Sequence, residues 1–581
     1  TLVSGRELPM HLGLPTRSVH GLPIIEHAEF GRNVPDEAMP DEDKMNLGKI
    51  YHMGKEEAAG LILNRQAMAS HTFITGSTGT GKSNAVYHLL DEITKNGQTT
   101  FLVVEPAKGE YKNVFGNCTD VQVFGTNPRE TPLLRMNPFA FPENIHILEH
   151  IDRLVEIFNA CWPMYAAMPA VLKDAIERSY QKVGWDLRNS ESEKGVFPTF
   201  FDLLDILPGV IEESHYSKDT QSDYVGALCT RVKSLTNGIY GSVLCAEDAL
   251  TDEALFDRNV IVDLSRVGSM ETKSLLMGIL VMKLQEYRMC SSGMNSRLRH
   301  VTVLEEAHNL LRKTSAEQSQ EGANLQGKSV EMLANAIAEM RTYGEGFIIA
   351  DQAPGLLDMS VIRNTNTKII LRLPDEEDRK LVGKSAALKE AQIDELSKLP
   401  LGVAAVYQNE WPEAVLCKIE AYPMPENAVY HKPSKMPHEI NAEFVFGQLA
   451  VGKELEPLSI SEMEQLKLWL KRHETVLKPE DDRYLERVFA GGELDVAKTR
   501  KAVFDFFGGI GTVVDYCAAA KKSLTPRKEF LEQLQGQYGL KAAAADWVLN
   551  SVISMGMSLN PDAKAVDNLR TNFEQQGGRV L

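Results

Sequence analysis

The chain has 581 residues, of which 43% are apolar and 24% are charged, and its formal net charge is −18. This composition predicts a soluble protein of several globular domains, and the acidic balance argues against a protein that coats nucleic acid over its whole surface. No apolar run approaches the ~20 residues of a membrane-spanning helix, and the 7 cysteines, dispersed without C-x-x-C pairs, predict reduced thiols, a cytoplasmic location and no zinc site.

The first region, residues 1–46, is rich in Pro, Gly and His, which predicts an extended arm or linker. An α/β pattern begins in residues 47–136. There, His71–Thr75 indicates a short buried strand, Ser83–Lys95 an amphipathic helix, and Gln98–Val104 a second strand. This order predicts a βαβ unit with a loop at the end of its first strand.

That loop matches the phosphate-binding pattern G-x-x-x-x-G-K-[ST]. Its glycines let backbone N–H groups turn inward around a phosphate, and the helix that follows adds positive potential. We expect Lys82 to reach the β- and γ-phosphates of ATP and Ser83 to ligate Mg²⁺. The residues predicted to bind the nucleotide are Gly76, Ser77, Thr78, Gly79, Thr80, Gly81, Lys82, Ser83 and Asn84.

Residues 137–240 have a helical pattern and predict an insertion into the α/β core. Its helices are expected at Glu149–Cys161, Met168–Val183, Phe200–Ile211 and Asp223–Leu235.

The α/β pattern returns in residues 241–433. Strands are predicted at Val260–Asp263, Val301–Leu304, Phe347–Ala350, Lys368–Leu373, Val403–Tyr407 and Ala414–Ala421, the last two resembling a hairpin. Residues 434–581 predict a helical C-terminal domain, with a capping box at Ser461 and Glu464 and a further helix opening at Thr525-Pro526. The predicted fold class is therefore α/β, with a helical insertion and a helical C-terminal region.

Two consecutive acids, Glu305 and Glu306, follow the predicted strand Val301–Leu304. The carboxyl ends of such strands are where α/β sheets place ligands. We expect Glu305 to hold the Mg²⁺ shell and Glu306 to polarise the attacking water. The alternative is a solvated helix start, because acids are favoured at helix N-termini.

Gln352 ends the next strand in a similar way and is predicted to sense the γ-phosphate or the water, although an ordinary strand-end turn is the alternative. Hydrolysis also needs an arginine that stabilises charge in the transition state, and ring ATPases often take it from a neighbouring subunit. We rank Arg341 first for this role, with Arg363 and Arg372 as rivals.

At this point the chain resembles the HerA/FtsK superfamily of P-loop motors, and HerA-type ATPases in particular. The resembling segments are HTFITGSTGTGKSN (71–84), VVEPAKGEY (103–111), VTVLEEAHNL (301–310), MRTYGEGFIIADQ (340–352) and NTKIILRL (366–373). The resemblance implies a RecA-like P-loop ATPase core over 47–136 and 241–433. It also implies a homohexameric ring, passage of double-stranded DNA through the central channel, and an arginine finger at Arg341, which matches R-x-[YF]-G.

The chain departs from the family pattern in three places. Gln352 is followed by Ala353 where the family often has Arg, and Glu105-Pro106 stands for the usual Asp-Pro. The usual N-terminal β-barrel is not recognisable before Leu47.

HerA-like proteins commonly act with a nuclease in DNA repair or with an effector enzyme in anti-phage defence, and no nuclease constellation is recognisable in this chain. A partner nuclease or effector is therefore expected. Cys161-Trp162-Pro163-Met164 and the helices after it also resemble type IV secretion and conjugation ATPases, which work at a membrane machine. An oligomeric scaffold that uses ATP as a switch is the third function class.

DNA contacts are expected in basic loops that face a channel, because the protein as a whole is acidic. The polar segment Leu311–Lys328 offers Arg312, Lys313 and Lys328, and a second candidate pair is Arg231 and Lys233. A solvated surface loop is the alternative for both. The tryptophans, including Trp162, Trp469 and Trp547, are expected in the core rather than as base-stacking platforms, since no basic residues interleave with them.

Overall fold

The computed structural model describes residues 18–20, 26–36, 39–95, 97–164, 167–192, 196–214, 216–246, 249–314, 325–424 and 428–432, with parts of 484–505 and most of 507–580. The chain divides into two compact units, Thr1–Lys432 and Pro433–Leu581, which are considered separately. The predicted capping box at Ser461 and Glu464 lies outside the described residues.

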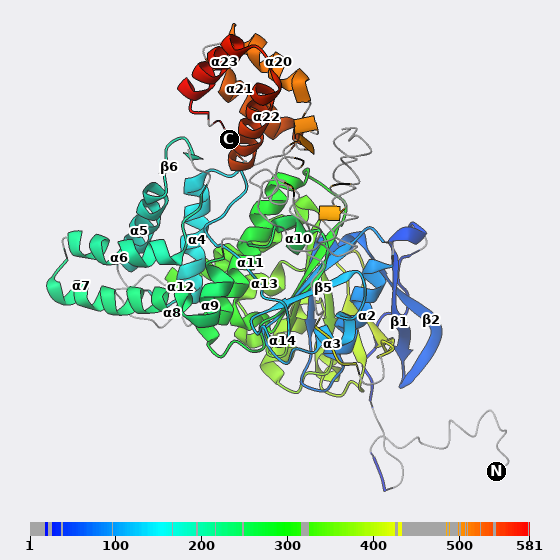
Figure 1. Ribbon diagram of the computed structural model, residues 1–581. Helices are drawn as coiled ribbons and strands as arrows, with labels where there is room; N and C mark the ends of the chain where they lie inside the picture. Colours follow the sequence, from blue (N-terminus) through cyan, green and yellow to red (C-terminus); the bar gives the residue numbers. More distant parts are fainter. Residues whose placement is uncertain are drawn as a thin grey trace, which may run out of the picture. The chain divides into compact units, whose positions relative to one another are not determined.

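An 11-stranded sheet forms the centre of the first unit, in the order β2-β1-β13-β12-β11-β3-β10-β9-β4-β8-β5 (Figure 1). From β11 to β5 all neighbouring strands are parallel, whereas β2, β1, β13, β12 and β11 pair antiparallel. The strands are β1 (Lys44–His52), β2 (Lys55–Asn64), β3 (Thr72–Thr75), β4 (Thr100–Glu105), β5 (Val121–Gly125), β8 (Asn259–Asp263), β9 (His300–Glu305), β10 (Glu345–Asp351), β11 (Thr367–Ile370), β12 (Val403–Tyr407) and β13 (Val415–Ile419).

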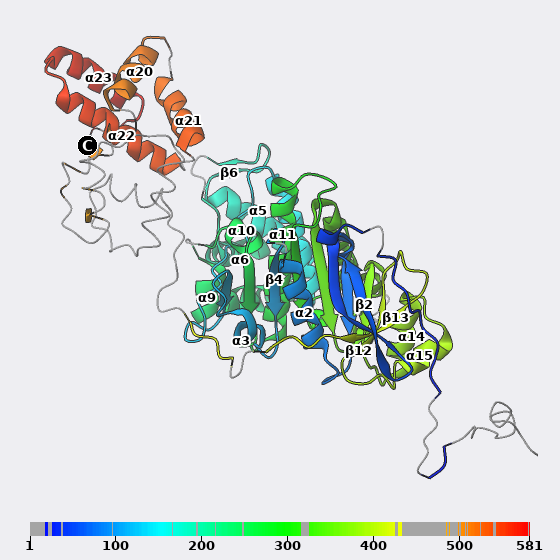
Figure 2. The same cartoon turned by 90° about the vertical axis from the view of Figure 1, so that its right-hand side faces the viewer.

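The central strands are short apolar runs because both of their faces are covered, as expected for a parallel sheet. Ile348 and Ala350 of β10 join the cluster that contains the apolar face of helix α2 (Lys82–Thr94). Ile349 lies next to Ile337 of α12 (Leu325–Glu339). Since side chains alternate along a strand, α2 and α12 cover opposite faces (Figure 2). A phosphate loop after β3, inside this parallel order, makes the core a RecA-like P-loop fold.

Every strand predicted from the sequence is present within a few residues of its expected bounds, and the predicted β12–β13 hairpin is confirmed by antiparallel pairing. The β1–β2 hairpin and β5 were not predicted. β1 begins at Lys44, before the expected end of the arm, and completes the antiparallel edge by pairing with β13. The arm before it is held by one bridge, Gly31 to Val415.

The helices of the core flank the sheet in chain order. They are α2, α3 (Tyr111–Phe115), α10 (Asp252–Phe256), α11 (Met270–Ser291), α12, α13 (Met359–Arg363), α14 (Glu376–Ser385) and α15 (Glu390–Glu395). Part of the expected loop Leu311–Lys328 is helical, because Leu325–Lys328 opens α12, whose apolar residues Val330, Leu333 and Ile337 pack inward. Residues 315–324 lie outside the described residues.

The segment between β5 and β8 is helical, as predicted. It contains α4 (Ile147–Cys161), α5 (Met168–Lys182), a two-stranded ribbon of β6 (Trp185–Asp186) and β7 (Glu191–Ser192), α6 (Phe200–Glu213), α7 (Lys218–Tyr224), a π-helical turn (Val225–Cys229), α8 (Thr230–Thr236) and α9 (Gly238–Leu244). Its helices α5–α8 project from the sheet as a group (Figure 1). Trp162 is buried at the end of α4, as expected of a core residue.

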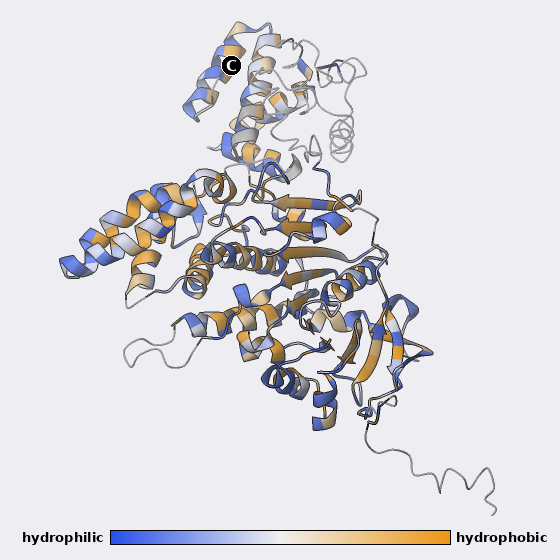
Figure 3. Ribbon diagram, turned by 90° about the horizontal axis from the view of Figure 1, so that it is seen from below, coloured by the Kyte–Doolittle hydropathy of each residue, from blue (hydrophilic) through white to orange (hydrophobic). Residues whose placement is uncertain are grey.

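The second unit is helical in its described part, with α20 (Gly509–Ala520), α21 (Pro526–Tyr538), α22 (Ala542–Leu559) and α23 (Ala563–Gln575). Tyr516, Phe530, Val552 and Phe573 belong to its own apolar core. Figure 3 shows apolar residues concentrated in the central strands of the first unit and alternating with polar residues along the helices. Among the described residues, no helix is both long and apolar enough to cross a bilayer.

Candidate functional site

The phosphate loop connects β3 to α2 and is fixed by main-chain bonds on both flanks. The backbone N–H of Ser77 donates to the carbonyl of Arg372 (3.0 Å), and the N–H of Gly402 donates to the carbonyl of Thr80 (3.0 Å). Gly81 has φ = 104°, a left-handed conformation that favours glycine, and it caps the start of α2. The loop is therefore a rigid turn that delivers Lys82 and Ser83 in the first turn of the helix.

Four neighbouring parallel strands end in an acid on one side of this loop. They are β10, β9, β4 and β8, ending in Asp351, Glu305, Glu105 and Asp263. The register aligns these residues, since Ala350 pairs with Glu305 and Glu105 pairs with Asp263. The carboxyl edge of the sheet is therefore a row of carboxyl groups beginning next to the phosphate loop.

Lys82 bridges the phosphate loop to this row. Its Nζ lies 3.3 Å from Oε2 of Glu305 and 3.2 Å from Oε1 of Glu306. Burial opposes the charged amine, but the two carboxylates outweigh it and raise the pKa of Lys82 above its ordinary value. The lysine is therefore a cation, held where a phosphate chain on the loop would reach it.

Glu306 has a left-handed backbone (φ = 45°, ψ = 51°), an uncommon conformation for a residue other than glycine. Its Oε1 also accepts a hydrogen bond from Nε2 of Gln352 (2.5 Å), and Oε1 of Gln352 accepts one from Thr78 (2.7 Å). The structure thus brings Lys82, Glu306 and Gln352 into one contact group, although they come from three separate strand ends.

His308 fixes the turn that carries Glu306. Its backbone N–H and its Nδ1 both bond to Oδ2 of Asp351, at 2.8 and 2.9 Å, and its Nδ1 lies 3.6 Å from Oε2 of Glu306. The bond to Asp351 raises the pKa of His308. Sequence reasoning did not single out this pair, although His308 lies inside the segment VTVLEEAHNL.

Behind Glu305 lies a buried layer that the sequence analysis did not predict. The hydroxyl of Tyr111 donates to Oε1 of Glu305 (2.5 Å), and burial raises the pKa of Tyr111 well above its ordinary value. The carboxyl of Glu105 accepts the backbone N–H groups of Glu110 (2.8 Å) and Tyr111 (3.1 Å). Burial raises the pKa of Glu105 to about 8, so this group is largely protonated at pH 7. The only sequence signal was the segment VVEPAKGEY.

These groups surround a single pocket. It is lined by Lys82, Ser83, Glu105, Ala107, Lys108, Glu110, Tyr111, Glu305 and Glu306. Among its side-chain oxygens are the hydroxyl of Ser83 and the carboxylate of Glu305, which are the hard oxygen donors that Mg²⁺ prefers.

The three candidate arginines lie apart from this pocket or only beside it. Arg341 is exposed in a 3₁₀ turn, Met340–Tyr343, that precedes β10, whereas Gln352 follows β10. A seven-residue strand therefore separates Arg341 from its own Glu306 by about 20 Å. Arg363 is exposed at the end of α13, and Arg372 is exposed beside the phosphate loop, which its carbonyl contacts.

The candidate DNA-contacting residues differ in how freely their charges are exposed. Arg312 and Lys313 are both exposed, and neither forms an ion pair with any described residue. Their backbone is anchored, because Arg312 bridges to Leu357. Arg231 instead lies 3.7 Å from Glu271 and donates to the carbonyl of Pro163 (3.5 Å). Lys233 in α8 and Lys328 in α12 are exposed.

Asn84, predicted to bind nucleotide, uses both ends of its amide elsewhere. Its Nδ2 donates to the carbonyl of Glu420 (3.0 Å), and its Oδ1 accepts the N–H of Tyr422 (2.9 Å). Its side chain therefore fastens the segment after β13 to the start of α2. Its backbone N–H remains in the first turn of the helix, where a phosphate would lie.

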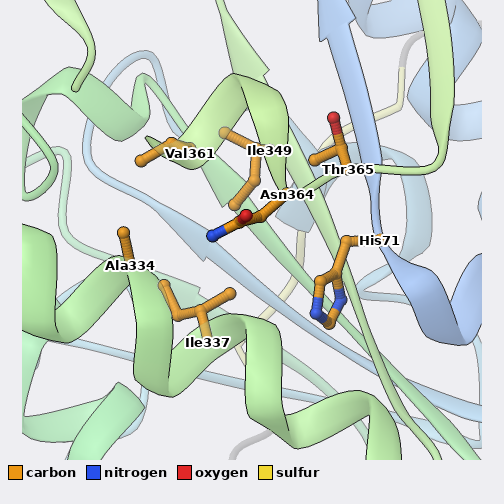
Figure 4. Close-up of a pocket in the computed structure, with 7 residues that line it drawn as sticks. All are labelled: His71, Ala334, Ile337, Ile349, Val361, Asn364 and Thr365. Atoms are coloured by element: carbon orange, nitrogen blue, oxygen red, sulfur yellow. The ribbon is translucent and has the colours of Figure 1, made fainter. Parts of the chain in front are cut away.

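A second, small pocket lies below β3 and is shown in Figure 4. His71, Ile349 and Asn364 line it together with Ala334, Ile337, Val361 and Thr365. Burial lowers the pKa of His71 to about 4, so the ring is neutral, and its Nδ1 accepts the N–H of Phe347 (3.1 Å). This pocket is part of the packing between α12 and the sheet rather than a site of acid–base chemistry.

Comparison with known proteins adds a family to this geometry. The family model described as the central domain of the helicase HerA matches residues 45–283. The chain is 25% identical over 393 residues to the DNA double-strand break repair helicase HerA of Sulfolobus acidocaldarius, covering 65% of this chain and 69% of that protein. It is 23% identical over 436 residues to a probable helicase of Methanocaldococcus jannaschii, covering 68% of this chain and 76% of that protein.

Among solved structures, the chain is similar to VirB4 of Thermoanaerobacter pseudethanolicus, with a TM-score of 0.49 and 17% identity over 66% of this chain and 98% of that one. It is also similar to the plasmid coupling protein TrwB in complex with ADP and Mg²⁺, with a TM-score of 0.46 and 16% identity over 69% of this chain and 98% of that one.

Proposed function

Since the chain is a HerA-like P-loop ATPase of the HerA/FtsK superfamily, we propose that it is a motor that couples ATP hydrolysis to movement along double-stranded DNA. The convergence of Lys82, Glu306 and Gln352 beside the phosphate loop carries this proposal. A loop that only binds phosphate needs no second carboxylate, whereas hydrolysis needs a base next to the terminal phosphate.

In this proposal, Lys82 neutralises phosphate charge, Glu306 accepts the proton of the attacking water, and Gln352 orients that water or the γ-phosphate. In the structure the three side chains bond to one another, so an incoming triphosphate must take Lys82 away from Glu306. Releasing Glu306 from that ion pair frees its carboxylate to act as a base. Binding and activation of the site are therefore one event.

The residues present fit a magnesium ion. The hydroxyl of Ser83 and the carboxylate of Glu305 line the same pocket as Lys82. When bound, Mg²⁺ bridges phosphate oxygens and neutralises their charge. The protein holds Glu305 in place through the Tyr111 hydroxyl, so the carboxylate is oriented before the ion arrives.

We further propose that the active unit is a ring, with Arg341 reaching the site of the neighbouring subunit. The distance of about 20 Å along β10 prevents Arg341 from acting on its own site. Gly344 (φ = 74°) ends the arginine-bearing turn, and a Cβ there would lie 2.2 Å from the carbonyl of Arg297, so the turn has one shape. It therefore presents Arg341 as a fixed projection.

Mixed rings test this arrangement. Arg341→Ala and Glu306→Gln chains should each be inactive alone, and together should regain hydrolysis at interfaces that join an intact Glu306 to an intact Arg341. No recovery on mixing, or a monomer by light scattering with ATP and Mg²⁺, would argue against the ring.

Double-stranded DNA is the substrate that the relatives named as DNA repair helicases suggest. Because the chain carries a net charge of −18, phosphate contacts must come from local basic groups. Arg312 and Lys313 are the best candidates, since they are exposed and form no ion pair with a described residue. Arg231 is a weaker candidate because Glu271 neutralises it.

The double variant Arg312→Ala/Lys313→Ala should weaken DNA stimulation of hydrolysis and lower the salt dependence of binding by about two phosphate contacts. Basal hydrolysis should stay unchanged. Arg188→Ala/Lys218→Ala, two exposed cations of the insertion, is the matched control. Unchanged DNA affinity and salt slope in the first variant would rule out this loop.

We also propose that cutting of DNA is left to a partner nuclease or effector, in repair or anti-phage defence, because the sequence offers no nuclease constellation. The purified chain should hydrolyse ATP but leave plasmid DNA intact in the presence of Mg²⁺. Cleavage by the chain alone would contradict this. Absence of DNA binding at low salt, together with cofractionation with membranes, would favour a secretion ATPase.

A further inference from the structure

The position of the phosphate loop within the sheet gives a bound nucleotide a direction. β3 lies between β10 and β11. Every side chain that we assign to the terminal phosphate, from Lys82 to Gln352, meets on the β10 side. Because the base of a nucleoside triphosphate is at the opposite end from its γ-phosphate, the base must extend towards the β11 side.

On that side, a short loop before β12 is fastened to the phosphate loop. Gly402 donates its N–H to the carbonyl of Thr80 (3.0 Å), and its Cα lies 3.4 Å from where a Cβ on Gly81 would be. The Nζ of Lys418 donates to the carbonyl of Leu401 (2.6 Å) and holds the loop from β13. Leu401 is thus placed next to the phosphate loop by bonds on both sides.

Leu401 is nevertheless one of the more exposed large apolar side chains, with 61% of its surface accessible. An apolar side chain at this exposure, on a loop that is otherwise rigidly bonded, is available as a contact surface. Leu399, two residues earlier, is 1% exposed and packs into the core, so the loop itself is not loosely folded.

Arg372 flanks the other edge of the same region. Its carbonyl accepts hydrogen bonds from both the N–H (3.0 Å) and the hydroxyl (3.1 Å) of Ser77. Its side chain is exposed and forms no ion pair with a described residue. A planar guanidinium without a carboxylate partner is suited to lie against an aromatic ring or a ribose.

We propose that Leu401 is the apolar platform for the nucleobase of the bound nucleoside triphosphate, and that Arg372 covers the ribose and the edge of the ring. This inference rests on the proposed function only in taking the phosphate loop as the triphosphate site. It adds the other half of the nucleotide site, which no motif in the chain marks. A purine covers more of such a platform than a pyrimidine, so purine triphosphates bind better.

The test separates the base from the phosphates. For each variant, the affinity for a non-hydrolysable ATP analogue is compared with that for inorganic tripolyphosphate, which has no base. Leu401→Ala should weaken the analogue about fivefold and leave tripolyphosphate within about twofold of wild type. Leu401→Met, which keeps the apolar surface, should restore the affinity. Met294→Ala, an equally exposed apolar residue (75%) before β9, is the control and should change neither.

Arg372→Ala should show the same selective loss, and Leu401→Ala should also narrow the preference for purine over pyrimidine triphosphates. Equal binding of the analogue by wild type and Leu401→Ala overturns the proposal. A parallel loss of tripolyphosphate overturns it too, because it would mean a distorted phosphate loop. Altered assembly with unchanged nucleotide affinity would instead make Leu401 a subunit contact. Failure of wild type to bind tripolyphosphate would count against the phosphate site itself.

Discussion

Strands β9 and β10 carry a cluster of buried charges at each end, and the two clusters differ in what remains open. At the amino end, Glu345 accepts hydrogen bonds from Arg288 (2.9 Å), His300 (2.7 Å) and Thr302 (2.8 Å). The side chains of Arg288 and Glu345 are 0% exposed. At the carboxyl end, Lys82 and Glu306 are 8% and 14% exposed and line a pocket.

The amino-end cluster is closed because each group has its partner within the chain. Burial lowers the pKa of His300, so that ring is neutral at pH 7 and Arg288 supplies the positive charge that compensates Glu345. The carboxyl-end cluster has the same types of residue but faces a space into which a ligand fits. The comparison teaches that a buried ion pair holds the sheet where it is saturated and serves chemistry where it can exchange partners.

Glu306→Gln should have the largest effect on the open cluster. Hydrolysis should fall about a thousandfold because the amide cannot accept a proton. Bound ATP should be retained, since Lys82 is intact, whereas Lys82→Ala should lose binding or turnover. Turnover and nucleotide retention measured on both variants check this. Wild-type turnover in Glu306→Gln would remove Glu306 as the base.

Glu345→Gln should have the largest effect on the closed cluster. It leaves the buried Arg288 without its charge partner, which is expected to lower the free energy of unfolding by about 3 kcal/mol. Glu331→Gln, at an exposed position of α12, should change it by less than about 0.5 kcal/mol. Chemical denaturation of both variants measures the difference, and equal midpoints would mean that the closed cluster does not hold the sheet.

The closed cluster should also show in acid. Burial alone would raise the pKa of Glu345, but His300 and Arg288 lower it to about 2 from an ordinary 4.5. A depressed carboxyl pKa stabilises the fold above the unfolded value, and this contribution is lost as pH falls from about 4.5 towards 2. Unfolding free energies measured between about pH 6 and pH 3 should therefore fall less steeply in Glu345→Gln than in wild type.

Tyr111→Phe should have the smallest effect. It removes the hydroxyl that donates to Glu305, so the Mg²⁺ concentration for half-maximal hydrolysis should rise about threefold. Tyr51→Phe, in β1 on the antiparallel edge of the sheet, is the control. A fall in turnover at saturating Mg²⁺ without a change in that concentration would place Tyr111 in packing rather than in positioning the carboxylate.

The two clusters also differ in how well a sequence predicts them. The residues of the open cluster lie in contiguous motifs at strand ends, so the sequence alone is enough to expect Lys82, Glu306 and Gln352 at one nucleotide site. The closed cluster has no such signal, because Arg288 and Glu345 lie on elements far apart in the chain and neither lies in a local pattern. Tyr111 was missed for the same reason, since its contact with Glu305 spans 194 residues.

The fold shows the same division between local and long-range information. Short apolar runs predicted the parallel strands well because both of their faces are buried. Helix α11 was missed because it is buried nearly all round and so lacks an amphipathic period. The β1–β2 hairpin was missed because Gly48 and Gly54 interrupt it and its partner, β13, lies at the far end of the core sequence.

The bonds that fix the phosphate loop have a consequence for how the chain is made. The loop is synthesised early, yet Ser77 waits for Arg372, Thr80 for Gly402, and Asn84 for Glu420. At about 5–20 residues per second, a ribosome reaches those partners roughly 20 s to 1 min after Thr80. During that interval the strand β3 has neither of its neighbours, β10 and β11. A nascent chain therefore acquires its nucleotide site only when the core is nearly complete, and ATP cannot assist the earlier steps of folding.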